Sequence, residues 1–369
     1  MKIVHVVRHF YPVIGGIQSA VFYLSQYLLS SGHQVEVVAL NRVIKDETYY
    51  FPDEEVIDGI NVKRVPYIGP QRFAIAPGVL RHILDCDLVH LHSSDFFLIY
   101  LVLTKLIHRK PIVFTTHGMF FHTKFAYQFK QIYFRTVAKW ALSQVKAIVC
   151  VSLHDYEMLS TVVSNQKLSL IPNGIQYDTL STFDLDGRDP DLLLSVGRLA
   201  SNKRYDRLLQ AFAVVVERRP TAKLMIVGPD SGCRTALEEM CVELGIVERV
   251  QLLGRVSEDD LLKYLRTAKV WVSSTEYESF GIALLEAMAS GCVPVVQSLT
   301  AFAQLIDDGK EGFFTDFDDP QQTAAVILQA IDLSDQLWQN LVQNARAKAQ
   351  QFSWKHVAQQ FESLYKKVL

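Results

Sequence analysis

The strongest constraint on the fold is a run of short apolar segments that alternates with helical segments along the chain. In the first half these segments are "KIVHVV", "HQVEVVAL", "DLVHLH", "PIVFTTHG", "KAIVCVS" and "LSLIPNGI", and a helix is predicted at 18–30. Continuous Val, Ile and Leu runs bounded by turns are typical of parallel strands that helices cover on both faces. The first half therefore predicts a parallel α/β domain.

The same pattern begins again near Asp191. Its strands are predicted in "DLLLSVGRL", "AKLMIVG", "RVQLLGRV", "KVWVSS" and "VPVV", with helices at 203–218, 234–244 and 258–267. Two successive βαβ series predict two Rossmann-like parallel-sheet domains, an α/β fold in which the domains face each other across a cleft.

The break between the two series lies at "IPNGIQYD", where Pro and Asn-Gly interrupt the pattern. We therefore predict an N-terminal domain at 1–172, which would bind the acceptor, and a C-terminal domain at 173–352. The segment 353–369 is predicted to form a helix that crosses back to the N-terminal domain.

Composition excludes several classes of protein. The formal net charge of −2 gives no overall attraction to nucleic acid, and 49% hydrophobic residues predict a packed core. Five cysteines without a CxxC pair argue against a disulfide framework or a zinc site, and favour a reducing cytoplasm. The longest apolar run, "FFLIYLVLTKLI", is broken by Lys105 and is too short to span a bilayer.

Paired Rossmann domains first suggest a dehydrogenase, but the dinucleotide fingerprint is missing. The first strand is followed by Gly15-Gly16 rather than GxGxxG, and Glu36 lies inside its strand instead of at the end. Gly15 and Gly16 either form a tight turn or let a phosphate or sugar approach the bare backbone at a helix N-terminus.

Two cations follow the first strand of the second series. Arg198 and Lys203 stand between a strand and the start of a helix, the place where ligands bind in an open α/β sheet. A guanidinium fork and an ammonium point charge beside a helix N-terminus suit a pyrophosphate. The alternative is that both are solvated loop residues.

Two carboxylates flank the start of a later helix in "YESFGIALLEAMASGCVPVV". We expect the helix to begin at 279–281, which at 1.5 Å per residue puts the backbones of Glu278 and Glu286 about 12 Å apart. That is about the distance from the sugar to the ribose of a sugar nucleotide. Free N–H groups near Phe280, Gly281 and Ile282 would then face the phosphates. The alternative for Glu286, which has apolar neighbours, is a structural salt bridge.

These motifs identify a family. "VGRLASNK", "LLGRVSEDDLLKYLRTAKVWVSS" and the Glu-x7-Glu segment resemble the retaining family 4 glycosyltransferases of the GT-B fold over nearly the whole chain. The resemblance implies that Glu278 contacts the donor sugar and Glu286 the ribose, that Arg198 and Lys203 bind the pyrophosphate, and that Gly16 approaches it from the other domain. In this fold the base is contacted largely by backbone, expected here around Gly254, Arg255 and Val256. Ser279 and Arg204 stand where the family more often has glycine.

The first half resembles one subgroup, the GDP-mannose:cellobiosyl-diphosphopolyprenol α-mannosyltransferases of xanthan- and acetan-type exopolysaccharide synthesis. The similar segments are "RFAIAP", which contains Arg72, and the stretch from "VHLHSSDFF" to "KQIYF". His117 matches the family histidine near the reacting sugar, and a core histidine is the alternative. Asp95 and His122 belong to the subgroup pattern.

A basic stretch precedes the end of the first domain. Phe96 to His154 contain eight Lys or Arg and no Asp or Glu. On one continuous helix at about 100° per residue, Lys124, Arg135, Lys139 and Lys146 would share roughly a 60° arc. Such a face suits an anionic membrane surface and a lipid diphosphate, and the alternative is an ordinary solvated helix face.

The function predicted from these residues and this resemblance is transfer of mannose from GDP-mannose to a polyprenyl-diphosphate-linked oligosaccharide, with retention. The enzyme would be peripheral on the inner face of the plasma membrane. No DxD motif or metal-ligand cluster stands out, so the cations and the helix end would replace a metal. The alternatives are a UDP-glucose or UDP-galactose donor with another acceptor, a sugar-nucleotide 2-epimerase, and a non-catalytic sugar-nucleotide sensor.

Overall fold

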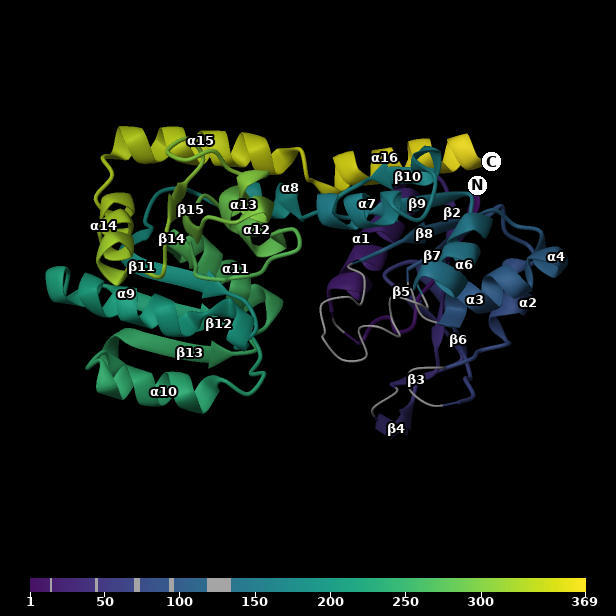
Figure 1. Ribbon diagram of the computed structural model, residues 1–369, viewed down its shortest axis with the longest axis horizontal. Coiled ribbons are helices and arrows are strands. Elements are labelled where there is room, and N and C mark those ends of the chain that lie inside the picture. The colour runs from purple at the N-terminus through teal and green to yellow at the C-terminus, as the bar shows by residue number, and fades with distance from the viewer. Residues whose placement is uncertain (14, 44–45, 70–73, 93–95, 118–133) are drawn as a thin grey trace. The chain divides into compact units, whose positions relative to one another are not determined.

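The computed structural model describes residues 1–13, 15–43, 46–69, 74–92, 96–117 and 134–369. The chain folds into two compact units (Figure 1). Unit 1 comprises Met1–Gly174 and Trp354–Leu369, and unit 2 comprises Ile175–Ser353. These limits lie within two residues of those expected from the sequence.

Unit 1 is built on an eight-stranded sheet in the order β10-β9-β8-β7-β1-β2-β6-β5. Its strands are β1 (Lys2–Val6), β2 (Gln34–Leu40), β5 (Glu54–Ile57), β6 (Ile60–Val65), β7 (Leu88–Leu91), β8 (Ile112–Thr115), β9 (Ala147–Cys150) and β10 (Leu168–Leu170). Neighbours are parallel except for β5, which runs antiparallel to β6. Ile3, Val4 and Val6 of β1 have no exposed surface, as expected of a central strand covered on both faces.

Helices complete this unit, together with the small hairpin β3 (Arg42–Val43) and β4 (Asp46–Tyr50). They are α1 (Gly16–Ser30), α2 (Val79–Ile83), α3 (Phe96–Leu103), α4 (Lys105–His108), α6 (Lys139–Gln144), α7 (Leu153–Ser160), the 3₁₀ turn η3 (Asn165–Lys167) and α16 (Trp354–Val368). Phe361 and Tyr365 of α16 pack with Ile3, Leu24 and Val113, so this helix belongs to the core of unit 1 (Figure 1).

The prediction of a single helix from 124 to 146 is wrong for the residues that the structure describes. Residues Phe134–Ala138 form a π-helical segment, η2, and α6 ends at Gln144. Val145 is extended, and the Lys146 N–H donates to Ile112 O at the start of β9. Because a π turn changes the angle per residue and Lys146 lies beyond the helix, the predicted common arc does not exist.

Unit 2 is built on a six-stranded, fully parallel sheet in the order β13-β12-β11-β14-β15-β16. Its strands are β11 (Asp189–Val196), β12 (Lys223–Val227), β13 (Val250–Gly254), β14 (Ala268–Ser273), β15 (Val293–Gln297) and β16 (Phe313–Thr315). The order reverses between β11 and β14. Ligands of open α/β sheets bind beyond the carboxyl ends of the strands at such a reversal.

The helical segments of unit 2 are α8 (Tyr177–Ser181), η4 (Ser201–Lys203), α9 (Tyr205–Arg218), α10 (Arg234–Glu243), η5 (Val247–Arg249), α11 (Glu258–Thr267), α12 (Ile282–Ser290), α13 (Thr300–Ala303), α14 (Pro320–Ile331) and α15 (Asp335–Gln350). In Figure 1, α9 and α14 pack against each other on one side of the sheet, and α12 packs with α15. The site therefore rests on helices that the core holds in place.

Candidate active site

Two loops meet at the strand reversal of unit 2, one after β11 and one after β14. The Glu276 N–H donates to Asn202 O over 3.0 Å, and Thr275 Oγ1 lies 3.0 Å from the same carbonyl oxygen. Ser274 Oγ lies 3.0 Å from Lys203 O and 2.8 Å from Arg204 O. These bonds fix the two loops to each other.

Lys203 and Glu278 form an ion pair across these loops. Lys203 Nζ donates to Glu278 Oε2 over 2.9 Å, and only 19% and 22% of their side-chain surfaces are exposed. The structure thus brings together two residues that the sequence predicts to contact neighbouring parts of one ligand. Each neutralises the other in the free protein.

Arg198 lies two residues beyond the end of β11, and Gly197 separates it from the strand. Its side chain is exposed, and no partner for its guanidinium exists among the described residues. A side chain at 197 would crowd the neighbours, because its Cβ would lie 3.1 Å from the Tyr205 hydroxyl and 3.4 Å from Lys203 Cε. Gly228, at a φ of +154°, packs on the same spot, and a Cβ there would meet Gly197 O at 2.0 Å. Sequence reasoning missed both glycines.

Arg204 takes up the left-handed conformation for which glycine is favoured. Its φ is +50° at the start of α9. Its guanidinium pairs with Asp206 at 2.8 Å and Glu276 at 3.2 Å. Two ion pairs therefore accompany the backbone strain at this position, for which the sequence resemblance implies glycine.

Helix α12 begins later than the sequence suggested. Gly281 is its N-cap at a φ of +104°, and Ile282 is the first helical residue. Residues 278–281 are not helical. The estimate of about 12 Å between the backbones of Glu278 and Glu286 assumed a helix over these residues and is therefore wrong in its premise. No side chain caps the helix, so its first N–H groups are available to an anion. A Cβ at Gly281 would lie 3.0 Å from Leu305, and the Phe280 ring packs edge-on against Phe352 at 5.7 Å.

Glu286 lies one turn into α12 and is partly buried. Burial raises the pKa of its carboxyl to about 7, and the negative charge of Glu258 adds to the shift. Within the described part of the chain, no donor or cation pairs with this carboxylate, which argues against a structural salt bridge. A carboxylate in such a position favours a ligand that donates hydrogen bonds to it.

Arg255 and Val256 follow β13, at the edge of the sheet where β11 and β12 also end. Arg255 is exposed and Val256 is partly buried. The preceding Gly254 has a φ of +69°, and its carbonyl accepts a 2.8 Å hydrogen bond from the Gly228 N–H. The β13 turn is thereby tied to the β12 turn.

In unit 1, Gly15 and Gly16 begin α1 without a side-chain cap. A Cβ at Gly15 would meet the flexible end of Gln18 at 2.5 Å, while a Cβ at Gly16 would meet nothing within 4 Å. Gly15 is extended rather than left-handed. Open space around Gly16 favours backbone access over a turn that needs glycine.

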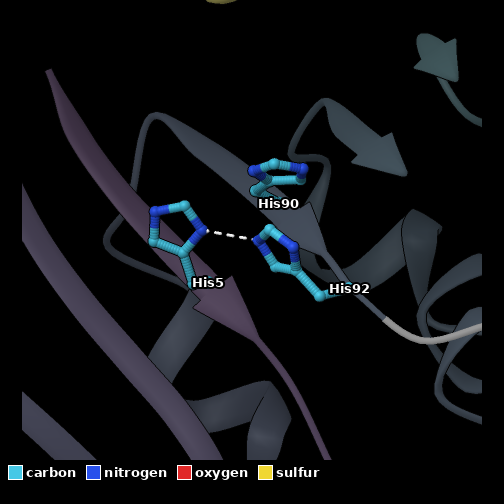
Figure 2. A group of neighbouring side chains, drawn as sticks. All are labelled: His5, His90 and His92. Carbon is cyan, nitrogen blue, oxygen red and sulfur yellow. Dashed lines mark hydrogen bonds between the residues drawn. The ribbon is translucent and has the colours of Figure 1, made fainter. Parts of the chain in front are cut away.

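His117, at the end of β8, belongs to a chain of hydrogen-bonded histidines. Its Nε2 lies 2.9 Å from His92 Nδ1, and His92 Nε2 lies 2.8 Å from His5 Nδ1. Figure 2 shows His5, His90 and His92 side by side: His5 is in β1, His90 is its partner in the neighbouring β7, and His92 directly follows β7. The backbone φ of His117 is +47°, which is unusual for a residue other than glycine. Sequence reasoning missed His5, His90 and His92, although the alternation in "HLH" puts two of them on one face.

Burial keeps these rings neutral. It lowers the pKa of His5 to about 3 and that of His117 to about 4, and lowers the pKa of His90 and His92 well below the usual range. One nitrogen from each of His5, His90 and His92 lies within 4.8 Å of the others, close enough for a shared metal ion. His90, however, already bonds to Thr115 Oγ1 at 2.7 Å and the Tyr365 hydroxyl at 2.6 Å. A metal would have to replace such bonds.

The remaining predicted residues concern the acceptor and the membrane. Arg72, Asp95, His122 and Lys124 lie outside the described residues. Arg135 is in η2, where only its backbone is described, and Lys139 and Lys146 are exposed. Their roles stay predictions.

Comparison with solved structures gives the fold. The Anabaena protein HepE, solved in complex with UDP, matches with a TM-score of 0.78 at 19% identity, and the match covers 100% of both chains. Sucrose-phosphate synthase from Thermosynechococcus elongatus matches with a TM-score of 0.74 at 19% identity, over 100% of this chain and 98% of that one. The two parallel-sheet units therefore have the GT-B fold.

Sequence comparison gives the family. The family model "Glycosyltransferase Family 4" matches residues 14–179, and "Glycosyl transferases group 1" matches residues 183–348. The chain belongs to the family 4 glycosyltransferases.

Several curated relatives match over almost their full length. A GDP-mannose:cellobiosyl-diphosphopolyprenol alpha-mannosyltransferase of Xanthomonas campestris is 33% identical over 99% of this chain and 96% of its own. The enzyme of that name from Komagataeibacter xylinus is 31% identical over 100% and 94%. A phosphatidyl-myo-inositol mannosyltransferase of Mycobacterium tuberculosis is 28% identical over 100% and 97%.

Proposed function

We propose that this glycosyltransferase moves mannose from GDP-mannose to a polyprenyl-diphosphate-linked oligosaccharide of the cellobiosyl type, with retention, in exopolysaccharide assembly. The observation that carries the proposal is the group at the strand reversal of unit 2, in which the Lys203–Glu278 pair lies beside an uncapped helix start. Its chemistry suits a sugar bonded to a diphosphate. The names of the relatives at 31% and 33% identity support the choice of mannose and of the lipid-linked acceptor.

The diphosphate is the leaving group, and it gains negative charge as the bond to the sugar breaks. Lys203 and the free N–H groups of α12 provide positive potential, and the exposed Arg198 has no competing partner among the described residues. Preorganised donors aimed at developing charge are the largest single contribution in many enzymes. We propose that these groups act without a divalent metal.

The two carboxylates would hold the hydroxyl groups on either side of the diphosphate. Glu278 would accept hydrogen bonds from the donor sugar once Lys203 turns to the phosphate. Glu286 would accept them from the ribose, whose hydroxyls would supply the partners that its carboxylate lacks among the described residues. A ligand that binds in this way favours the charged form of Glu286 and lowers its pKa.

A donor panel tests the proposal. GDP-mannose, GDP-glucose, UDP-glucose, UDP-galactose and UDP-N-acetylglucosamine are compared for nucleotide release, with and without lipid-linked cellobiose, in buffer containing EDTA. Among these donors we expect fast nucleotide release only from GDP-mannose, and only when the acceptor is present. NMR should show an α-linked product. Faster nucleotide release from a UDP-sugar would show that this sugar nucleotide is the donor. Turnover of UDP-N-acetylglucosamine without acceptor would indicate an epimerase. Binding without release in every case would indicate a sensor.

We further propose that unit 1 rests on an anionic membrane surface. No helix among the described residues is both long and apolar enough to span a bilayer. At α3 and α4, however, Leu103 is 63% exposed, Leu106 87% and Ile107 63%, beside the exposed cation Arg109. Apolar side chains next to cations, in a stretch that contains no acidic residue, suit insertion between anionic head groups.

Flotation with liposomes of phosphatidylglycerol and phosphatidylcholine tests this placement. Leu106→Glu should reduce binding at 0.5 M salt, where the apolar contribution dominates because charges are screened. Val242→Glu is the matched control, since Val242 is 68% exposed on α10 of unit 2. If both variants floated as well as the wild type, α4 would not be part of the membrane contact.

A further inference from the structure

The histidine chain of unit 1 has a direction. Because burial keeps the rings neutral, each imidazole carries one N–H donor and one bare nitrogen acceptor. The two bonds, His5 Nδ1 to His92 Nε2 and His92 Nδ1 to His117 Nε2, therefore run either from His5 toward His117 or in reverse. Heavy-atom positions alone do not distinguish the two arrangements.

The buried end of the chain distinguishes them. His5 Nε2 is buried and has no hydrogen-bond partner among the described residues. The neighbouring His90 offers no acceptor, since its nitrogens already bond to Thr115 and Tyr365. If the bonds ran from His117 toward His5, His5 Nε2 would carry a buried N–H without an acceptor, and orphaned N–H groups are the rarer defect in proteins. Bonds that run from His5 leave only a bare nitrogen there.

We propose that His5 and His92 set the tautomer of His117, so that its Nε2 accepts from His92 and its proton stays on Nδ1. The partly exposed His117 then presents an N–H donor at the end of β8 and has no free basic nitrogen. It binds an oxygen acceptor, a hydroxyl or a phosphate oxygen, and does not remove a proton from the attacking hydroxyl. Only the nature of that oxygen rests on the proposed function; the tautomer does not.

Long-range ¹H–¹⁵N NMR correlation tests the tautomer directly. The full chain is labelled with ¹⁵N-histidine and measured at pH 7 with EDTA, and the His117 signals are assigned with His117→Gln. Protonated and bare ring nitrogens have well separated ¹⁵N shifts. We expect a bare Nε2 and a protonated Nδ1 at His117. A protonated Nε2, or a doubly protonated ring, would overturn the proposal.

Variants test the role of the chain. His5→Asp replaces the first donor with a carboxylate, which can only accept, so His92 must donate from Nε2 and the reversed tautomer of His117 should become populated. The isosteric His5→Asn should keep the original pattern, because its amide N–H replaces Nδ1–H. His90→Phe is the matched control: the His90 ring lies 3.8 Å from the His92 ring by centroids but is outside the chain of bonds. An unchanged His117 tautomer in His5→Asp would refute control by His5.

Activity is measured on the same variants. Turnover of His5→Asp should fall about tenfold, equivalent to about 1.4 kcal/mol, with the donor KM little changed, and turnover of His5→Asn should stay close to that of the wild type. Normal turnover despite a reversed tautomer would show that the donor N–H is not used in transfer. If the wild type has the expected tautomer but transfers no sugar from any donor in the panel, the proposed function fails and the tautomer stands.

Discussion

His5 in unit 1 and Glu286 in unit 2 are both ionisable groups that burial drives toward the neutral form, but their surroundings differ. The histidines bond to one another, and His90 adds bonds to Thr115 and Tyr365. Glu286 has no partner among the described residues, and its pKa rises to about 7. Except for His5 Nε2, the ring nitrogens of His5, His90 and His92 are hydrogen-bonded before any ligand arrives. For Glu286 we propose that a ligand supplies the partners.

This difference separates two ways of preparing a site. The chain that ends at His117 orients a neutral donor, and its bonds hold without substrate. Around Lys203 and Glu278 the charges neutralise each other and must separate to meet a diphosphate and a sugar. We therefore expect changes in unit 2 to act on both donor binding and turnover. Changes in the histidine chain of unit 1 should act on protonation, local stability and turnover, with little effect on donor binding.

The largest effect should come from the cations of unit 2. Lys203→Ala and Arg198→Ala should each lower turnover by about 10²–10³-fold, the range for removal of one preorganised donor. They should also weaken the binding of free GDP, while guanosine should bind as to the wild type. Steady-state kinetics and calorimetry measure these effects.

Lys263→Ala, at an exposed position of α11, is the control for that change. Equal losses in guanosine and GDP binding would show that Lys203 and Arg198 support the fold rather than the phosphates. The contrast between the two units would then disappear.

The next effect concerns acid stability in unit 1. Histidines whose pKa is lowered by folding bind fewer protons in the native than in the unfolded state, so the free energy of unfolding falls as pH drops below 6.5. For a pKa near 3 the loss between pH 7 and pH 5 is about 2 kcal/mol. Hydrogen-exchange mass spectrometry, corrected for intrinsic rates, should show weaker protection of β1, β7 and β8 at pH 5.

The smallest effect is on the stability of unit 2, and its dependence on pH is opposite to that of the histidines. A carboxyl whose pKa rises from about 4.5 to about 7 binds more protons in the native state, so stability falls as pH rises through this range. Without ligand, Glu286→Gln should therefore stabilise unit 2 at pH 8 by about 1–2 kcal/mol, reduced from the full shift because the group is partly exposed. At pH 4 the effect should vanish. Exchange in α12 measures it.

Glu243→Gln, at an exposed site on α10, should leave α12 exchange unchanged at both pH values. In the same Glu286→Gln variant, donor affinity should fall by about 1.5–3 kcal/mol, as for a hydrogen bond to a charged group. Lower stability together with unchanged donor affinity would restore the structural salt bridge as the interpretation of Glu286.

The sequence predicted what depends on local pattern and on the general rule for parallel sheets. Continuous apolar runs indicated the central strands. Lys203 was expected near a ligand because it follows the carboxyl end of a strand, and Glu278 because it precedes a helix start and matches the Glu-x7-Glu segment of the family. The histidine chain could not be derived in this way, since it requires knowing that β1 pairs with β7. The approach of Gly228 to Gly197 O likewise depends on two neighbouring turns.

Two local expectations failed for reasons of backbone geometry. The helix at 282 starts after Gly281 because that residue is left-handed, and helical periodicity does not register such a residue. Lys146 left the predicted arc because a π-helical segment and an extended Val145 precede it. A helical wheel assumes one continuous helix with a constant angle per residue, which fails for the segment from Phe134 to Lys146.

The position of α16 bears on how the protein is made. Residues 354–369 are synthesised after all of unit 2, yet Phe361 and Tyr365 pack in the core of unit 1, and Tyr365 bonds to His90. On the ribosome, unit 2 can therefore close its sheet while unit 1, although made first, still exposes the apolar face that α16 covers. The unit that begins the chain is the last to be completed, and nascent chains that stop before residue 354 are the ones that should need chaperone protection.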